Sequence, residues 1–150
     1  MEHTFRLAQG SDADALLALM RGLYEHDRIA FDEAGARAAF SQLLADDRLG
    51  LVHLILLGGE VAGYVVLTFG FSLEFRGRDA FVDELFVKKE SRGRGAGAAA
   101  VRFAEDLCRA RGVRALHLEV ERSNTRAQDL YRRAGFRDHD RYLLTKWVDE

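Results

Sequence analysis

The chain has 150 residues, of which 48% are hydrophobic and 31% charged, and its formal net charge is −2 at pH 7. This length predicts a single domain over residues 1–150, and the composition is typical of a globular protein, which excludes a disordered chain. The small net charge gives no general electrostatic reason to bind nucleic acid or an anionic membrane, and we expect neither as a partner.

Cysteine usage and the start of the sequence indicate the compartment. The single cysteine, Cys108, excludes an internal disulfide and points to a reducing environment. No apolar run approaches the roughly 18 residues of a membrane span, and residues 1–3 lack a basic-then-apolar signal. We therefore expect a cytoplasmic protein. The five histidines show no metal-ligand spacing, so we expect no metal.

The elements follow one another in a mixed order. A strand, two helices and three strands come first, the first two of those three strands joined at Gly58-Gly59, a dipeptide typical of a hairpin turn. A helix, a strand, a helix and one or two closing strands follow. We expect strands at 4–8, 51–57, 61–69, 80–87, 114–120 and one or two within 136–147. We expect helices from about residue 11 and at 32–47, 98–111 and 125–134. The order predicts an α+β fold, a mixed sheet with helices on both faces.

The most informative segment is the glycine-rich loop before the helix at 98–111. Gly93, Gly95 and Gly97 stand where uncovered backbone N–H groups and the helix dipole favour a phosphate. The loop is neither a Walker A motif nor the dinucleotide fingerprint. A purely structural turn is the alternative. Arg92 and Arg94 either add charge to such a site or are solvated loop side chains.

Two motifs carry a resemblance to a known family. Residues 92–97, Arg-Gly-Arg-Gly-Ala-Gly, fit the Arg/Gln-x-x-Gly-x-Gly/Ala loop of the GNAT (Gcn5-related) N-acetyltransferase superfamily. Residues 124–136 match that family's Asn-x-x-Ala-x-x-Leu-Tyr-x-x-x-Gly-Phe segment. The resemblance covers residues 5 to about 147. It implies the GNAT acyl-CoA N-acyltransferase fold, with a mostly antiparallel twisted sheet, and acetyl-CoA as the acyl donor.

The resemblance also implies where the donor binds. Amides of the glycine loop would hold its pyrophosphate, the strand before the loop would bind the pantetheine arm, and an amide of Val87 or Phe86 would bond to the thioester oxygen. Asn124 would bond to the arm, or else cap the helix that follows it. The implied cofactor-binding residues are Leu85, Phe86, Val87, Arg92, Gly93, Arg94, Gly95, Ala96, Gly97, Ala98, Asn124, Ala127 and Tyr131.

Acetyl transfer to an amine also needs a base. A lysine-like amine with a pKa of about 10.4 is protonated at pH 7, and its deprotonation costs about 4–5 kcal/mol. Asp83 and Glu84 are the candidate acceptors of that proton. Adjacent strand residues point to opposite faces, so one of the two faces the amine, and we expect the other in a salt bridge. Asp83 aligns with the family's catalytic glutamate, whereas Glu84 has the longer reach.

Tyr131 matches the family's tyrosine that faces the thioester sulfur and supplies a proton to the leaving thiolate. A phenol is a weaker acid than a thiol, so a hydrogen bond to the developing thiolate is sufficient. The alternative is a core aromatic side chain beside Leu130. We read Cys108, on the apolar helix face, as a core residue. The implied mechanism is direct attack in a ternary complex, with no acyl-enzyme.

The sequence says least about the identity of the acceptor. Residues 70–87 are most similar to the diamine and thialysine acetyltransferase branch, although the acidic pair reads Asp-Glu instead of Glu-Asp. The end of the first helix either lines an acceptor pocket or is solvated; its candidate residues are Tyr24, Glu25 and Asp27. We expect a primary amine acceptor, polyamine-like or lysine-like. Transfer to a protein or an aminoglycoside and a non-catalytic acyl-CoA sensor are the alternatives.

The resemblance also implies a homodimer. Most members of the family pair, and the aromatic residues Tyr142 and Trp147 in the C-terminal strands could supply the contact.

Overall fold

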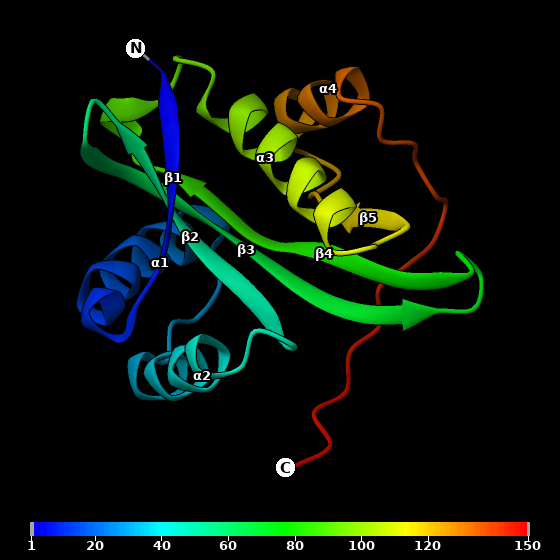
Figure 1. Cartoon of the computed structure of the whole chain (residues 1–150), viewed down its shortest axis with the longest axis horizontal. Helices are drawn as coiled ribbons and strands as arrows, with labels where there is room; N and C mark the ends of the chain where they lie inside the picture. The colour runs from blue at the N-terminus through cyan, green and yellow to red at the C-terminus, as the bar shows by residue number, and fades with distance from the viewer. Residues whose placement is uncertain (1, 150) are drawn as a thin grey trace.

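A five-stranded sheet forms the centre of the computed structural model, which describes residues 2–149 (Figure 1). The strand order is β1-β2-β3-β4-β5; the first four strands pair antiparallel, and β5 is parallel to β4. The strands are β1 (His3–Leu7), β2 (Gly50–Leu57), β3 (Glu60–Ser72), β4 (Gly77–Val87) and β5 (Ala115–Leu118). The helices are α1 (Ala13–Asp27), α2 (Glu33–Ala45), α3 (Ala96–Ala110) and α4 (Thr125–Arg133), with 3-10 turns η1 (Gly10–Asp12) and η2 (Lys89–Ser91).

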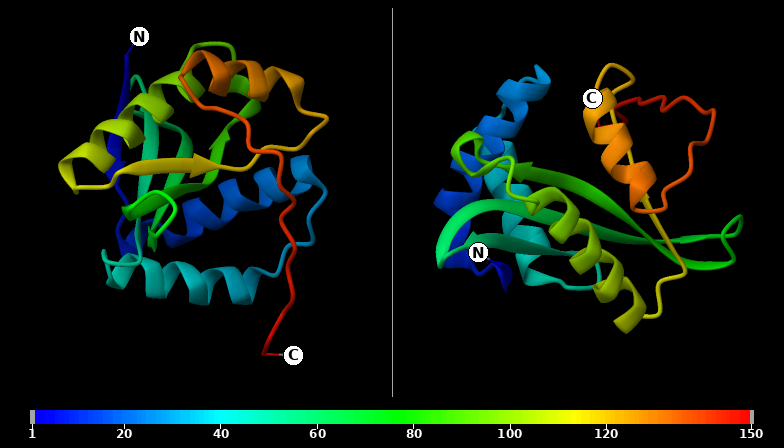
Figure 2. Two further views of the ribbon diagram at one scale, coloured as in Figure 1. Left: turned by 90° about the vertical axis from the view of Figure 1, so that its right-hand side faces the viewer. Right: turned by 90° about the horizontal axis from the view of Figure 1, so that it is seen from above.

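The sheet is covered on both faces. Helices α1 and α2 lie on one face and α3 lies on the other, with α4 next to α3 (Figures 1 and 2). Successive strand residues point to opposite faces, and the neighbours Leu54 and Ile55 are both fully buried, each in a different core cluster. The predicted mixed class with helices on both faces is confirmed.

The hairpin between β2 and β3 also follows the prediction. Gly58 and Gly59 form its two-residue turn with φ angles of 61° and 84°. Such turns require a positive φ at both central positions, which glycine adopts without a steric penalty.

The predicted closing strands within 136–147 are wrong for the single chain. After α4, residues 134–149 contain no helix or strand and run past the tip of the β3–β4 hairpin (Figure 1). A strand exists only where a neighbouring strand accepts and donates its backbone hydrogen bonds, and no described strand pairs with this segment. β5 is likewise shorter than the predicted 114–120.

Candidate active site

Strand β4 carries a β-bulge in the middle of its acidic pair. The register of β3 against β4 shifts at this point, and Asp83 has no residue opposite it. A bulge bends the strand and redirects the side chain that it carries. On its other side, β4 separates from β5, because their pairing ends at Val82, opposite Leu118. Residues 83–87 therefore have one free edge, which faces a gap between two diverging strands.

Backbone alternation decides which groups face this gap. The Lys88 amide donates to the Ala62 carbonyl at 2.8 Å and so points toward β3. Groups two residues apart on a strand point the same way. The amide of Phe86 therefore also points toward β3, and the amides of Leu85 and Val87 point into the gap. Of the two predicted donors to a thioester oxygen, Val87 has the suitable orientation.

The glycine loop ends at the free N-terminus of α3. Gly93 and Gly95 have φ angles of 79° and 80°, and Gly95 occupies the N-cap without a side-chain hydrogen bond. The first backbone bond in the helix runs from the Ala99 amide to the Gly95 carbonyl at 3.0 Å. The amides of residues 96–98 therefore have no acceptor within the helix. Uncovered amides at a helix N-terminus favour an anion, and the phosphate site that the sequence predicts here stays a prediction.

The two loop arginines differ. Arg92 donates from Nε to the Val87 carbonyl at 2.9 Å, and its guanidinium lies 5.6 Å from the centre of the Phe86 ring. These contacts fix the end of β4 against the loop. Arg94 is exposed.

Glu84 is held by two tyrosines. Its Oε2 accepts from the Tyr24 hydroxyl at 2.7 Å and its Oε1 from the Tyr64 hydroxyl at 2.8 Å. The carboxylate thus joins α1, β3 and β4. Burial raises the pKa of Glu84, and the two hydroxyl hydrogen bonds only partly oppose this shift. The predicted salt bridge for one member of the acidic pair is replaced here by a pair of tyrosine hydrogen bonds.

We expect Glu84→Ala to lower the free energy of unfolding by about 1–3 kcal/mol, because it leaves the fully buried Tyr64 without its acceptor. Glu84→Gln is the matched control, since its amide can accept from one hydroxyl and donate to the other.

The folded-state pKa of Glu84 is raised, so the wild type loses stability relative to Glu84→Gln as the pH rises from about 4.3 through that raised value. Urea unfolding of both variants between pH 4 and 8 measures this. Equal stability of the Ala and Gln variants would contradict the predicted contribution of the hydrogen bond from Tyr64 to Glu84.

Asp83 differs from its neighbour. Its residue is exposed at the bulge, yet surrounding protein atoms remove enough water to raise the pKa of its carboxyl group. Within residues 2–149, no side-chain hydrogen bond or ion pair engages this carboxylate. Of the two predicted candidates, Asp83 is the one with free oxygens.

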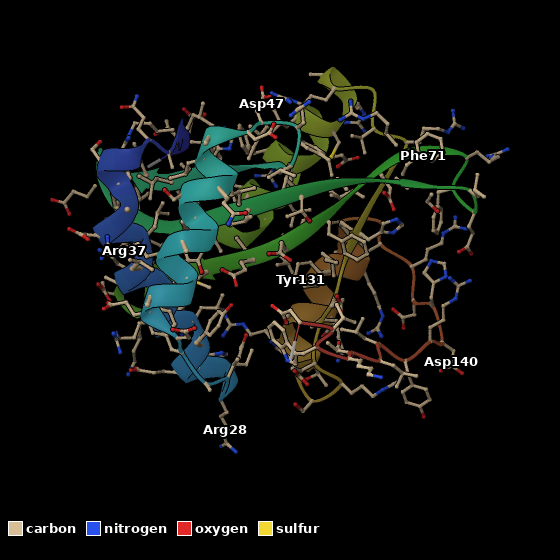
Figure 3. The ribbon with its side chains drawn as sticks, turned by 90° about the horizontal axis from the view of Figure 1, so that it is seen from below. Arg28, Arg37, Asp47, Phe71, Tyr131 and Asp140 are labelled. Atoms are coloured by element: carbon tan, nitrogen blue, oxygen red, sulfur yellow. The ribbon has the colours of Figure 1, made fainter. Side chains whose placement is uncertain are left out.

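Tyr131 lies on α4, across from the end of α1 that Arg28 marks (Figure 3). Its ring makes an edge contact with Phe136, with the ring centres 6.0 Å apart. Burial raises the pKa of Tyr131, and the nearby Asp27 carboxylate raises it further. The hydroxyl therefore stays protonated and can act as a hydrogen-bond donor at neutral pH.

Asn124 caps α4. Its Oδ1 accepts from the Ala127 amide at 3.2 Å, so the predicted capping contact is present, and binding to the cofactor arm stays a prediction. The Asn124 side-chain amide keeps its N–H donors for a further partner.

The end of α1 contributes acidic groups to the site. Asp27 lies three residues after Tyr24 on α1, so the two side chains are on the same face of the helix. Tyr24 reaches the site directly through Glu84. Glu25 is exposed, and no hydrogen bond or ion pair in the described part of the chain joins it to the other site residues. Of the three predicted acceptor residues, the structure therefore joins Tyr24 to the acidic pair and places Asp27 on the same helix face as Tyr24.

Tyr64 is a site residue that sequence reasoning missed. It is fully buried in β3, among aliphatic neighbours. A buried tyrosine hydroxyl needs a partner, and that requirement was the available signal. Cys108 is buried, and burial raises the pKa of its thiol, in agreement with its reading as a core residue.

Two further properties concern residues 2–149 as a whole. They contain no group of three or more His, Cys, Asp or Glu side chains placed to hold a metal ion. None of their helices combines the length and apolar character needed to cross a lipid bilayer.

Comparison with known sequences agrees with this geometry. The profile of the acetyltransferase (GNAT) family matches residues 17–136. The uncharacterized N-acetyltransferase YhfO of Bacillus subtilis (strain 168) is 30% identical over 133 residues, 89% of each chain. The thialysine N-epsilon-acetyltransferase of Bos taurus is 29% identical over 143 residues, covering 89% of this chain and 83% of that protein.

Solved structures share the fold. An integron cassette protein, HFX_CASS3, from the mobile metagenome of Cole Harbour Salt Marsh has a TM-score of 0.84 and 39% identity over 96% of this chain and 90% of its own. An aminoglycoside N-acetyltransferase, AAC(6')-Iy in complex with CoA, has a TM-score of 0.82 at 15% identity, over 98% and 95% of the two chains. Because the family profile spans most of the sequence, the chain belongs to the acetyltransferase (GNAT) family of N-acetyltransferases.

Proposed function

We propose that the protein transfers the acetyl group of acetyl-CoA to the primary amine of a small cationic acceptor, polyamine-like or lysine-like, in a ternary complex. The observation that carries this proposal is the arrangement around one gap. The unpaired edge of β4 carries Asp83 and forms one wall, and Arg92 ties the loop before the free amides of α3 to the end of that edge. Helix α4, which carries Tyr131, contacts the start of α3, where Leu130 lies beside Gly97.

The residues around the gap suit this donor. Amides 96–98 would hold its pyrophosphate, each charged hydrogen bond contributing on the order of 1.5–3 kcal/mol. The backbone of Leu85 and Val87 would bind the pantetheine arm, and the free side-chain donors of Asn124 would bond to it from the other side. Two solved structures of the same fold contain acetyl-CoA or CoA, both at 15% identity, which supports the choice of donor.

We expect Gly95→Ala to weaken CoA binding about tenfold or more. The φ of Gly95 is 80°, and a side chain there costs roughly 1–2 kcal/mol or turns the following amides away from the phosphates. Gly112→Ala is the matched control, because Gly112 has a φ of 70° and, like Gly95, nothing within 4 Å of an added Cβ. Both variants lose similar stability, whereas only Gly95→Ala loses affinity in calorimetric titration. Equal affinity of the two variants would move the phosphate site elsewhere.

Asp83 has the position and the free oxygens of a general base. It would take the proton from the acceptor's ammonium group, directly or through water, and the neutral nitrogen would attack the thioester carbon. The Val87 amide would stabilise the oxyanion. As the carbon–sulfur bond breaks, Tyr131 would donate a hydrogen bond to the developing thiolate, and the second proton, which the nitrogen loses as the amide forms, would pass to the sulfur. The products are the N-acetylated amine and CoA thiol.

The acceptor side of the gap is acidic. Glu84 accepts a hydrogen bond from the Tyr24 hydroxyl, and Asp83 is its neighbour on β4. Asp27 lies one helical turn after Tyr24 on α1, and carboxylates around an aromatic ring favour a cationic acceptor. The relatives' names cover more than one acceptor, a thialysine and the alanine of a ribosomal protein, so this class rests on the acidic groups of the site.

Release of CoA thiol from acetyl-CoA, measured against a panel of amines, tests the function. The panel contains polyamines, thialysine, lysine, aminoglycosides and peptides. Turnover with polyamines or thialysine supports the proposal. Turnover with peptides or aminoglycosides alone replaces the acceptor class, and CoA binding without turnover on any amine indicates an acyl-CoA sensor.

A further inference from the structure

The face of β4 that carries Glu84 continues toward the β3–β4 hairpin. Three β4 residues pair with alternate residues of β3 and so share one face: Glu84 with Val66, Phe81 with Thr68 and Asp79 with Gly70. Helices α1 and α2 cover this face near Glu84, and both strands extend past them toward Phe71 (Figure 3). On this extension Phe81 is 39% exposed. Asp79 and Phe81 therefore lie next to the acidic pair, on a part of the face that α1 and α2 leave uncovered.

Asp79 is a mostly buried carboxylate without a basic partner of fixed charge. Its side chain is 13% exposed, and its Oδ2 lies 3.2 Å from Nε2 of His117 on β5. Within residues 2–149, no lysine or arginine side chain forms an ion pair with it. A neutral imidazole orients a carboxylate without cancelling its charge, and a charge removed from water favours a partner of opposite sign. Asp79 is therefore placed to attract a cation.

Gly70 leaves one oxygen of Asp79 accessible. A Cβ added at Gly70 would lie 2.9 Å from Oδ1 of Asp79, so any side chain at this exposed position would displace the carboxylate. In the described part of the chain, the hydrogen bond of Asp79 uses Oδ2, and none uses Oδ1. Asp79 thus presents one oxygen to His117 and keeps the other for a further partner.

Aromatic rings surround this carboxylate. We name Phe75, Asp79, Phe81 and His117 the distal cluster. The centre of the His117 ring lies 4.6 Å from that of Phe75 and 4.9 Å from that of Phe81. Aromatic rings beside a carboxylate suit an alkylammonium group, because its methylene chain packs on the rings while its charge faces the carboxylate. The distal cluster has the composition of a site for a cation on an apolar chain.

The place of the donor determines the direction in which the acceptor extends. In the proposed function, the pantetheine arm takes the edge of β4 at residues 85–87 and the reacting amine lies at Asp83. The remainder of the acceptor must then run the other way along β4, over Phe81 to Asp79. Four residues at about 3.4 Å each, shortened by the bulge, place the two aspartates on the order of 10–13 Å apart along the strand.

We propose that the distal cluster binds a second ammonium group of the acceptor at Asp79, so that the enzyme selects a linear amine with terminal nitrogens about 10–13 Å apart. An extended aliphatic chain advances about 1.25 Å per bond, so this span is about 8–10 bonds, the length of 1,8-diaminooctane. A lysine-like acceptor has only about six bonds between its nitrogens and does not reach Asp79. The inference rests on the proposed function and narrows its acceptor to the polyamine-like class.

Thiol release from acetyl-CoA with three matched amines tests the selection. Octylamine has the chain of 1,8-diaminooctane without the second ammonium group, and 1,4-diaminobutane has two ammonium groups on a short chain. For the wild type, kcat/KM with 1,8-diaminooctane should exceed that with each of the others at least about tenfold, the effect of one charged hydrogen bond. In Asp79→Asn, the ratio of 1,8-diaminooctane to octylamine should fall at least about tenfold. Asp106→Asn makes the same change at an exposed residue of α3, on the other face of the sheet, and should keep the wild-type ratio.

A calorimetric titration of 1,8-diaminooctane into the CoA complex does not depend on turnover. We expect Asp79→Asn to weaken this binding at least about tenfold, and retained CoA binding shows that the variant is folded. Turnover with equal kcat/KM for octylamine and 1,8-diaminooctane, or an unchanged ratio in Asp79→Asn, would overturn the distal site and leave the proposed function intact. Absence of turnover with every amine would overturn the proposed function, and the titration alone would then decide whether Asp79 binds the diamine.

Discussion

Tyr131→Phe should lower the rate of amine-dependent CoA release at least tenfold while leaving CoA affinity unchanged. The departing thiolate needs a donor, and the raised pKa of Tyr131 keeps its hydroxyl protonated. The phenylalanine ring preserves the packing against Phe136, so binding and folding persist. Steady-state thiol release with the best amine of the panel, together with calorimetric titration of CoA, measures both quantities.

The dependence on the leaving group identifies the origin of this loss. An acetyl thioester with a more acidic thiol needs less help as it departs, so the ratio of wild-type to Tyr131→Phe rates should decrease with such a donor. A loss of affinity as large as the loss of rate would assign Tyr131 to donor binding instead. An unchanged rate would make it the core aromatic residue that the sequence left as the alternative.

Local patterns in the sequence predicted most of the fold. The turn at Gly58-Gly59 and the loop around Gly95 depend on the φ freedom of glycine, which is a property of single residues. The long buried strands β2 and β3 follow from apolar runs with no polar face. These features need no knowledge of distant contacts.

The site could not be predicted in the same way, because it depends on contacts between residues that are far apart in the sequence. Glu84 is 60 residues from Tyr24 and 20 from Tyr64, and only the folded sheet brings the two hydroxyls to one carboxylate. The bulge at Asp83 arises from the register of β3 against β4, which no local pattern specifies. Residues 136–147 illustrate the reverse case, since their local preference for a strand finds no strand partner within residues 2–149.

Asp83→Asn should lower kcat/KM at pH 7 by about 10²–10³-fold, the usual contribution of a general base. The pKa of Asp83 is raised, so this base becomes protonated at a higher pH than an ordinary aspartate. As the pH is lowered, the wild-type rate therefore begins to fall at that higher pH. In the variant, solvent must deprotonate the amine, and the neutral fraction increases tenfold per pH unit up to the amine pKa of about 10.4. The ratio of wild-type to variant rates should therefore be largest near pH 7 and decline toward pH 10.

Glu84→Gln is the comparator that decides between the two carboxylates. Both oxygens of Glu84 are already engaged by tyrosines, so this variant should lose less activity, by a factor that stays constant between pH 7 and pH 10. A pH profile of kcat/KM for the wild type and both variants on one amine tests this assignment. If the pH-dependent loss occurs in Glu84→Gln and not in Asp83→Asn, then Glu84 is the base, and one of its tyrosines must release it when the amine binds.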